Sequence, residues 1–220
     1  TNSTISPNFP FINGIVYTAA PDGNGGLYIG GYFSKVGPQS RTNIARINAD
    51  GTLHPWNPSV NSTVTAIYVT SNTVYIGGNF SSAGGQSRNR LAALSATSGT
   101  VLSWNPTANS QVLSLTGNAS AIYVSGYFTS ISGTTRNYVA AIDATTGTVL
   151  PCNPNPNSYV YSLALGGDTL YVAGSFTSIG GSARSYLAAV NATTGSALPW
   201  NPAPNSYLQK IFIDGTTLYA

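Results

Sequence analysis

A phrase of nine residues recurs four times along this chain, and each occurrence begins 48 residues after the previous one. It reads WNPSVNSTV from Trp56, WNPTANSQV from Trp104, CNPNPNSYV from Cys152 and WNPAPNSYL from Trp200. Repetition at a fixed period of about 20–50 residues indicates a repeat architecture, in which each repeat is one supersecondary unit stacked on its neighbours. We therefore expect the 220 residues to fold as a series of similar units.

The repeat extends well beyond this phrase. Tyrosines in short apolar segments lie 47, 48, 48 and 48 residues apart, at Tyr28, Tyr75, Tyr123, Tyr171 and Tyr219. The segments around the first four read LYIGGYF, VYIGGNF, IYVSGYF and LYVAGSF. An arginine follows each of these four tyrosines thirteen residues later, at Arg41, Arg88, Arg136 and Arg184. A second apolar segment (NIARI, LAALS, VAAID or LAAVN), a glycine-containing turn and the nine-residue phrase complete each unit.

Each unit predicts four short strands joined by turns. In the fourth unit these strands are expected at residues 159–165, 170–176, 186–190 and 196–200, separated by segments rich in Gly, Asn, Asp and Thr. The chain has no Glu and only 6% charged residues, so a large helical content is not expected. One four-stranded antiparallel sheet per 47–48 residues is typical of a β-propeller blade, whereas a parallel β-helix normally repeats at shorter periods.

The expected fold class is therefore all-β, a β-propeller segment spanning residues 1–220. We expect complete blades at about residues 14–57, 63–105, 111–153 and 159–201, and a partial fifth blade at 207–220. First strands are expected near 14–20, 64–70, 111–117, 159–165 and 207–213. A closed four-bladed ring has no place for a fifth first strand. We therefore expect an open arc, or part of a larger ring of about six to eight blades completed by further chain.

Composition argues against several classes of function. The net charge of +3 comes from eight Lys and Arg residues spread thinly along the chain, whereas a nucleic-acid binder concentrates its cations on one face. No run of 18 apolar residues occurs, so membrane insertion is not expected. Cys152 is the only cysteine, which excludes an internal disulfide and a cysteine-based zinc cluster. Because it replaces the tryptophan of the other units, we expect Cys152 in a buried packing position, in a slot that is smaller or filled by Tyr159 or Tyr161.

The pattern LYVGG-F-T-IGG---R--LAA-DATTG, followed by WNP, resembles the delta-sixty type propeller repeat of large secreted bacterial surface proteins. The resemblance covers nearly the whole chain, from about Gly14 to Ala220. It implies an extracellular or cell-surface module within a longer multidomain protein. It implies no catalytic residue, because the repeat has no shared catalytic motif.

The two most strongly repeated features are expected on one face of the propeller. In a blade of four strands, the connection to the next blade and the loop between the second and third strands share that face. We interpret the arginines and the WNP–Asn phrase as structural joints, since every blade must meet the next at the same angle; the alternative is a ligand site. The prolines stiffen these connections, and the asparagines are expected to bond nearby backbone within the turn. The expected joint residues are Arg41, Arg88, Arg136, Arg184, Trp56, Trp104, Trp200, Asn61, Asn109, Asn157 and Asn205.

The glycine and phenylalanine of each GG-F segment are also expected to be structural. The glycines should allow a close approach or a bulge, and the phenylalanines should fill the space between blades. The glycines are Gly31, Gly78, Gly126 and Gly174, and the phenylalanines are Phe33, Phe80, Phe128 and Phe176.

Positions that vary between units are the better candidates for function. Two such positions, after Asn-Ser and two residues after the arginine, hold tyrosine in the later units. Tyrosines on one face can stack on sugars or contact a protein, although packing between neighbouring loops is the simpler explanation. The candidate ligand-binding residues are Tyr138, Tyr159, Tyr186 and Tyr207.

The sequence lacks a convincing catalytic constellation. It has a single histidine, His54, and five Asp residues that lie apart, mostly in or beside turns. We expect no enzymatic activity, no metal and no cofactor. The function expected from the sequence is a non-enzymatic extracellular scaffold or adhesion module, whose partners are other blades or domains of the same chain. Surface glycans or proteins are further expected partners, and the alternative function is a carbohydrate-binding, lectin-like module that uses the tyrosines.

Overall fold

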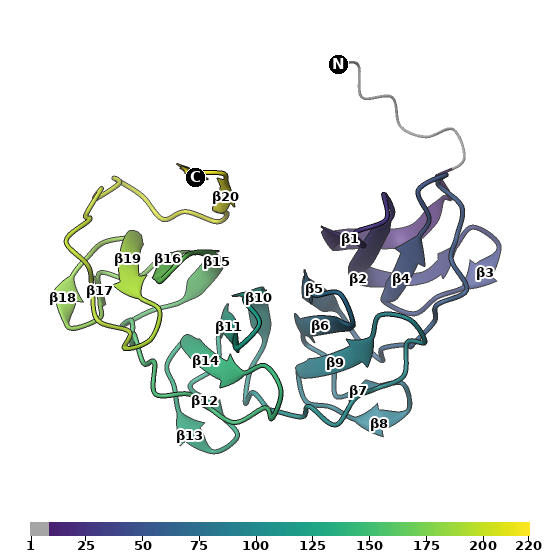
Figure 1. Ribbon diagram of the computed structural model, residues 1–220, viewed down its shortest axis with the longest axis horizontal. Helices are drawn as coiled ribbons and strands as arrows, with labels where there is room; N and C mark the ends of the chain where they lie inside the picture. Colours follow the sequence, from purple (N-terminus) through teal and green to yellow (C-terminus); the bar gives the residue numbers. More distant parts are fainter. Residues whose placement is uncertain (1–8) are drawn as a thin grey trace. The chain divides into compact units, whose positions relative to one another are not determined.

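The computed structural model describes residues 9–220 (Figure 1), which form two compact units divided between Ser103 and Trp104. All regular structure in the described residues is antiparallel β-sheet, and no helix occurs there. These residues accordingly contain no helix long and apolar enough to cross a membrane. The expectation of an all-β chain with a negligible helical content is confirmed.

The first unit contains two main sheets. One has the order β1-β2-β3 with β4 also paired to β2, and the other has the order β5-β6-β9; β7 and β8 form a small separate pair. The strands are β1 (Ile12–Pro21), β2 (Leu27–Val36), β3 (Gln39–Ser40), β4 (Ile44–Ile47), β5 (Val64–Val69), β6 (Thr73–Gly78), β7 (Ser82–Ala83), β8 (Gln86–Ser87) and β9 (Leu91–Ser95).

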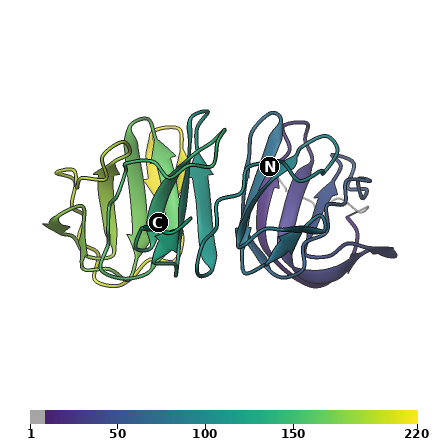
Figure 2. The ribbon, with the colours of Figure 1, turned by 90° about the horizontal axis from the view of Figure 1, so that it is seen from below.

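The second unit contains the sheets β10-β11-β14 and β15-β16-β19, the small pairs β12-β13 and β17-β18, and the hairpin β20-β21. Seen from below in Figure 2, the strands of the main sheets run across the thickness of each unit. The strands are β10 (Val112–Gly117), β11 (Ala121–Gly126), β12 (Ser130–Ile131), β13 (Thr134–Thr135), β14 (Val139–Asp143), β15 (Val160–Gly166), β16 (Thr169–Gly174), β17 (Ser178–Ile179), β18 (Ser182–Ala183), β19 (Leu187–Asn191), β20 (Phe212–Asp214) and β21 (Thr217–Tyr219).

Three of the main sheets have three strands, where the sequence predicted four. The segment expected as the fourth strand makes a single antiparallel bridge to the third strand, at Leu94–Val101, Ile142–Val149 and Val190–Ala197. Only a few residues separate the preceding turn from the WNP or CNP phrase, and its proline has no N–H to donate to a ladder. Pairing therefore ends after one residue pair. The loop between the second and third strands is more ordered than expected, because it contains a short two-residue hairpin such as β7-β8.

The fifth first strand is shorter than predicted. A strand was expected at residues 207–213, but β20 spans only Phe212–Asp214. Its partner is β21, a strand of three residues, so the ladder consists of three residue pairs. Residues 207–211 thus form no strand, and the ladder between β20 and β21 begins only at Phe212.

The repeated glycines allow two strands to approach closely. A Cβ added at Gly126 would collide with the carbonyl oxygen of Gln111, and one at Gly174 would collide with that of Tyr159. The first strand shifts register opposite each glycine, as between Val160 and Ser162. The close approach and the bulge predicted for these glycines are thus both present.

Hydrophobic clusters join consecutive sheets within each unit. In the first unit, Tyr28 and Trp56 pack in one cluster with Val74 and Phe80 of the following repeat. In the second unit, Phe176 packs in a cluster that also contains Tyr123 of the preceding repeat. The phenylalanines of all four GG-F segments are buried. Phe80 and Phe176 lie in clusters that span two sheets, as predicted, whereas Phe33 packs with residues around its own sheet.

Candidate ligand-binding surface

The four repeated arginines make the same pair of hydrogen bonds. Arg136 donates from Nη1 to the carbonyl of Thr135 at 2.9 Å and from Nη2 to that of Leu150 at 2.9 Å. Arg184 does the same with Ala183 at 2.8 Å and Leu198 at 3.1 Å. The second carbonyl lies two residues before Cys152 or Trp200. The guanidinium therefore ties the loop after the second strand to the start of the connection, and its planar fork suits two fixed acceptors.

Arg41 and Arg88 hold the equivalent carbonyls in the first unit. Arg41 bonds Ser40 and His54, and Arg88 bonds Ser87 and Leu102. Both arginines are buried. The recurring guanidinium is thus used within the protein at all four positions.

The asparagines of the phrase clamp the next repeat, and the predicted bond to nearby backbone is not what the structure shows. Asn157 Oδ1 accepts the N–H groups of Thr177 and Ser178 at 2.9 and 3.1 Å, and Nδ2 donates to Thr177 Oγ1 at 2.8 Å. Asn61 and Asn109 make the same three bonds to their own following loops. The partners lie about twenty residues downstream because the connection runs directly beside that loop. The fourth asparagine, Asn205, is exposed.

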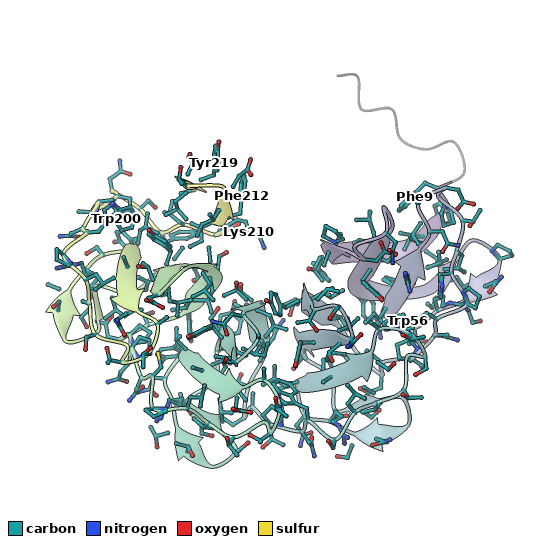
Figure 3. All side chains as sticks on the ribbon, in the orientation of Figure 1. Phe9, Trp56, Trp200, Lys210, Phe212 and Tyr219 are labelled. Carbon is teal, nitrogen blue, oxygen red and sulfur yellow. The ribbon has the colours of Figure 1, made fainter. Side chains whose placement is uncertain are left out.

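Two of the tryptophans also reach into the following repeat. The indole N–H of Trp56 donates to the carbonyl of Ser95 at 2.9 Å, and that of Trp104 donates to Asp143 at 2.9 Å. Each of these side chains is only 3% exposed. Trp200, labelled in Figure 3, is 42% exposed and packs edge-to-face on Tyr171 at 5.4 Å.

Cys152 is buried, as predicted, but Tyr159 and Tyr161 do not fill its slot. Tyr159 packs against Tyr127 and Tyr138, and Tyr161 packs against Tyr207. A cavity of about 250 Å³ lies beside the thiol. Burial raises the pKa of the Cys152 thiol to about 11, although nearby Arg136 lowers it, so the thiolate is scarce at neutral pH.

The position two residues after each arginine adopts a left-handed backbone in every repeat. The φ angles are 65° at Asn43, 66° at Arg90, 62° at Tyr138 and 66° at Tyr186. Such angles are strained for a bulky side chain, but two backbone hydrogen bonds hold each residue: its N–H donates to the phenylalanine of the GG-F segment, and its carbonyl accepts from the glycine two residues before that phenylalanine. Tyr138, for example, donates to Phe128 and accepts from Gly126. These two bonds therefore set the backbone conformation in every repeat, although the residue type differs between repeats.

The structure brings three of the four predicted tyrosines into one aromatic cluster with two others. Tyr159 contacts Tyr138 at 5.5 Å and Tyr127 at 4.8 Å between ring centroids, and Tyr161 contacts Tyr207 at 6.0 Å. The two groups are neighbours on this surface: burial raises the pKa of Tyr127, and the nearby Tyr161 and Tyr159 raise it further. We call Tyr127, Tyr138, Tyr159, Tyr161 and Tyr207 the tyrosine cluster.

Tyr186 is half-buried and takes no part in the described ring contacts of this cluster. The sequence prediction missed Tyr127 and Tyr161. Tyr127 lies between the Gly and Phe of its segment, where the other repeats hold Tyr32, Asn79 and Ser175. This variability is the same signal that selected the other candidates.

The tyrosine cluster offers both apolar rings and hydroxyl groups to solvent. Tyr127, Tyr159 and Tyr207 are 37%, 45% and 50% exposed. Next to the rings, Tyr161 donates to Ser175 Oγ at 3.3 Å, and the hydroxyls of Ser158 and Ser175 lie 3.2 Å apart. Exposed rings beside neutral hydrogen-bonding groups are suited to an uncharged, hydroxyl-rich ligand.

A polar cleft of about 600 Å³ lies elsewhere in the second unit. Its lining combines the connection after Cys152 with the loop before Arg184 and the turn after β19, and it contains only neutral side chains and glycines. Within residues 9–220 no group of three or more His, Cys, Asp or Glu side chains is placed to hold a metal ion. The chemistry available in this cleft is hydrogen bonding by amides, hydroxyls and backbone.

Comparison with known proteins supports the repeat and the fold. The family described as "Domain of unknown function (DUF5122) beta-propeller" matches residues 22–55 and 71–101. Among curated proteins, none matches this chain.

Two computationally designed proteins of known crystal structure are similar in fold. The Ika8 protein has a TM-score of 0.58 at 12% identity, covering 95% of this chain and 68% of its own. The Ika4 protein has a TM-score of 0.53 at 14% identity, covering 72% of this chain and 84% of its own. The chain therefore carries a β-propeller repeat similar to that of the domain of unknown function.

Proposed function

We propose that this chain is a non-enzymatic β-propeller module that serves as an extracellular scaffold or adhesion element of a larger surface or secreted protein. One observation carries the proposal. The repeated arginines donate hydrogen bonds to the protein's own backbone. The asparagines and tryptophans of the first connections likewise bond to the protein's own backbone and loops. Residues that recur because they build the fold are unavailable as a shared ligand site.

Each main sheet is, in this proposal, one blade of the 47–48-residue repeat, with the bridged segment as a rudimentary fourth strand. Further blades of the same chain would cover surfaces that are exposed here. Trp56 and Trp104 are covered by the repeat that follows them, whereas Trp200 is 42% exposed. Tyr17 on β1 and Phe212 on β20 are 54% and 55% exposed. Additional blades in a ring of about six to eight would remove these apolar groups from water.

The extracellular location rests on the surface chemistry and on the resemblance to secreted propeller repeats. Solubility comes from hydroxyl and amide groups, with only 6% charged residues. Treatment of intact cells of the source organism with an impermeant protease should degrade the protein while a cytoplasmic marker survives. Protection of both proteins until the cells are lysed would contradict the proposed location.

The tyrosine cluster favours a second candidate function, a carbohydrate-binding module. Glycan-array binding by the wild type should fall in Tyr159→Ala and Tyr207→Ala if the cluster holds sugars. Tyr32→Ala is a matched control, because Tyr32 occupies the position of Tyr127 in the first repeat and is 62% exposed. Loss of binding in the first two variants at unchanged thermal stability would support the lectin function. The absence of binding by the wild type would leave the scaffold as the better account.

A further inference from the structure

The cavity beside Cys152 has an apolar floor and a polar rim. Ala121, Tyr123, Ala141, Cys152 and Ala192 are buried and form the floor. Asn118, Ser120 and Thr193, which also line the cavity, are exposed and mark its opening to solvent. All of these residues belong to the second unit, so the cavity lies within one compact body.

The equivalent place in other repeats holds an aromatic ring of the chain itself. Trp56 packs edge-to-face on Tyr28, with ring centroids 5.0 Å apart, and Trp200 packs on Tyr171 in the same way at 5.4 Å. Tyr123 is the corresponding tyrosine of the third repeat, and its repeat supplies Cys152 in place of tryptophan. The third repeat thus retains the tyrosine on which a tryptophan packs in other repeats, but it has no tryptophan of its own at this place.

Tyr123 makes a hydrogen bond equivalent to one of Tyr28, although Arg46 lies over the ring of Tyr28 and the third repeat has Ala141 at that position. The Tyr28 hydroxyl donates to the carbonyl of Ala96 at 3.0 Å, and the Tyr123 hydroxyl donates to that of Ala192 at 3.0 Å. The ring of Tyr123 is therefore held in place by its own hydrogen bond. A ligand meets a preformed aromatic surface and need not order it, which lowers the entropic cost of binding.

The size of the cavity limits what it can take. Its volume of about 250 Å³ is below that of most drug-sized sites and above that of a cavity of about 150 Å³ known to hold benzene. Just outside the cavity, the connection after Cys152 lies closer to the following turn than it does in the tryptophan-containing repeats. The backbone atoms of Asn153 and Pro154 lie 2.6 Å from the position that a Cβ on Gly195 would take, whereas Trp56 Nε1 lies 3.2 Å from that on Gly99. The remaining space suits a flat molecule of one or two rings.

We propose that this cavity is a binding site for a small planar aromatic molecule, which packs on Tyr123 where the other repeats place their own tryptophan. The ring of the ligand lies against Ala121, Tyr123 and Ala192. Its polar edge, where it has one, points to the amide and hydroxyl groups of Asn118 and Ser120 at the rim.

Indole is the probe that tests this proposal, because it is the side chain that the slot lacks. Titration of the ¹⁵N-labelled wild type with indole should produce saturable amide shifts confined to the residues around the cavity. Cyclohexanol, which is similar in size to one ring but not planar, should produce markedly smaller shifts. Shifts scattered over the chain, or shifts that do not saturate, would overturn the proposal without any variant.

Two variants at residue 152 then locate the site. Cys152→Trp fills the cavity and should weaken indole binding at least about tenfold, since the side chain competes for the same space. Cys152→Ala keeps the cavity open and should bind indole as the wild type does. Equal affinity of the folded Cys152→Trp protein and the wild type would place indole elsewhere and refute the assignment.

Discussion

The repeated arginines illustrate at the scale of one residue how the chain joins its parts. Arg136 bridges the carbonyls of Thr135, at the end of β13, and Leu150, in the segment after β14. Arg136→Ala should lower the free energy of unfolding by about 1–3 kcal/mol, because the acceptors lose their partners. Arg184→Ala should cost a similar amount. Urea denaturation followed by circular dichroism measures the change.

A lysine at position 136 provides the control for charge. Arg136→Lys retains the positive charge but lacks the planar fork that reaches both carbonyls, so it should recover only part of the loss. Full recovery would mean that charge alone matters and that the bridge contributes nothing.

A cavity lies beside Cys152, where the sequence predicted a slot that is smaller or filled by Tyr159 or Tyr161. Because the space next to Tyr123 is open, Cys152→Trp should stabilise the protein by about 0.5–2 kcal/mol through burial of the added ring. A melting temperature higher than that of the wild type is the expected result in differential scanning calorimetry. A lower melting temperature would show that the backbone of Asn153 and Pro154 cannot move away from Gly195.

The Asp22–Arg46 pair makes part of the stability depend on pH. The Arg46 guanidinium bonds Asp22 Oδ2 at 2.7 Å, and the Asp22 side chain is 3% exposed. Burial alone would raise the pKa of Asp22, but hydrogen bonds from Asn24, Arg46 and Gly26 outweigh it and hold the pKa below 3.8. The folded state therefore binds the proton less readily than the unfolded state. The stabilisation is present above the ordinary pKa and is lost as the pH falls below about 4.

Asp22→Asn should separate this contribution from general acid denaturation. The variant should be less stable than the wild type at pH 7, by about 1.5–3 kcal/mol for the lost charged hydrogen bonds. The difference should shrink as the pH falls from 5 to 2 in urea titrations. A difference that stays constant over this range would contradict the assignment to Asp22.

Between elements, consecutive first strands are linked by a serine side chain. Ser162 Oγ on β15 accepts the N–H of Ile211 at 3.1 Å and donates to its carbonyl at 3.3 Å, just before β20. Ser114 Oγ on β10 accepts the N–H of Leu163 at 3.1 Å in the same way. Both serines are buried. One serine hydroxyl thus provides the acceptor for a backbone N–H of the next repeat, at a place where the two first strands are not paired in a ladder.

Ser162→Ala should therefore destabilise the protein by about 1–3 kcal/mol, because the N–H of Ile211 would stay buried without an acceptor. Ser125→Ala is the matched control. Ser125 is also buried, but its hydroxyl has no hydrogen-bond partner among the described residues, and the fourth repeat has Ala173 at that position. This variant should be neutral or more stable in denaturant titrations. Equal losses in both variants would show that serine volume, and not the hydrogen bond, is what counts.

The strands could be predicted from sequence because alternation and turn residues are local properties. Residues 159–165 and 170–176 were expected as strands, and β15 and β16 lie there. The partners of Asn157 could not be predicted, since an asparagine after proline suits a local turn equally well and only the folded connection brings it to Thr177. Likewise Tyr127 joins Tyr159 only through the close approach of β15 and β11. A single bridge replaces the fourth strand because strand pairing competes with the WNP or CNP phrase that follows directly. The outcome of this competition could not be predicted from the sequence.

At the scale of the whole molecule, the same contacts recur from repeat to repeat within each unit. In such arrays stability is approximately the sum of the repeats and of the interfaces between neighbours. Trp56 and Trp104 show what an interface supplies, namely burial of the indole and an acceptor carbonyl in the next repeat. Trp200 has the same sequence context but is 42% exposed. The exposure of the Trp200 indole therefore indicates whether a following blade covers it.

Replacing residues 207–220 by a copy of residues 159–199 should bury Trp200. The copy supplies a second Asn191, whose carbonyl would accept the indole N–H of Trp200, and the turn that follows it. It adds no further tryptophan. The fluorescence emission of Trp200 should move to shorter wavelength, and acrylamide should quench it less. The free energy of unfolding should rise by the contribution of one interface between repeats. The same pair of chains carrying Trp200→Phe isolates this signal from those of Trp56 and Trp104. Unchanged quenching of Trp200 in the extended chain would contradict the proposal that further blades complete the propeller, because the indole would then lack a site in the following repeat.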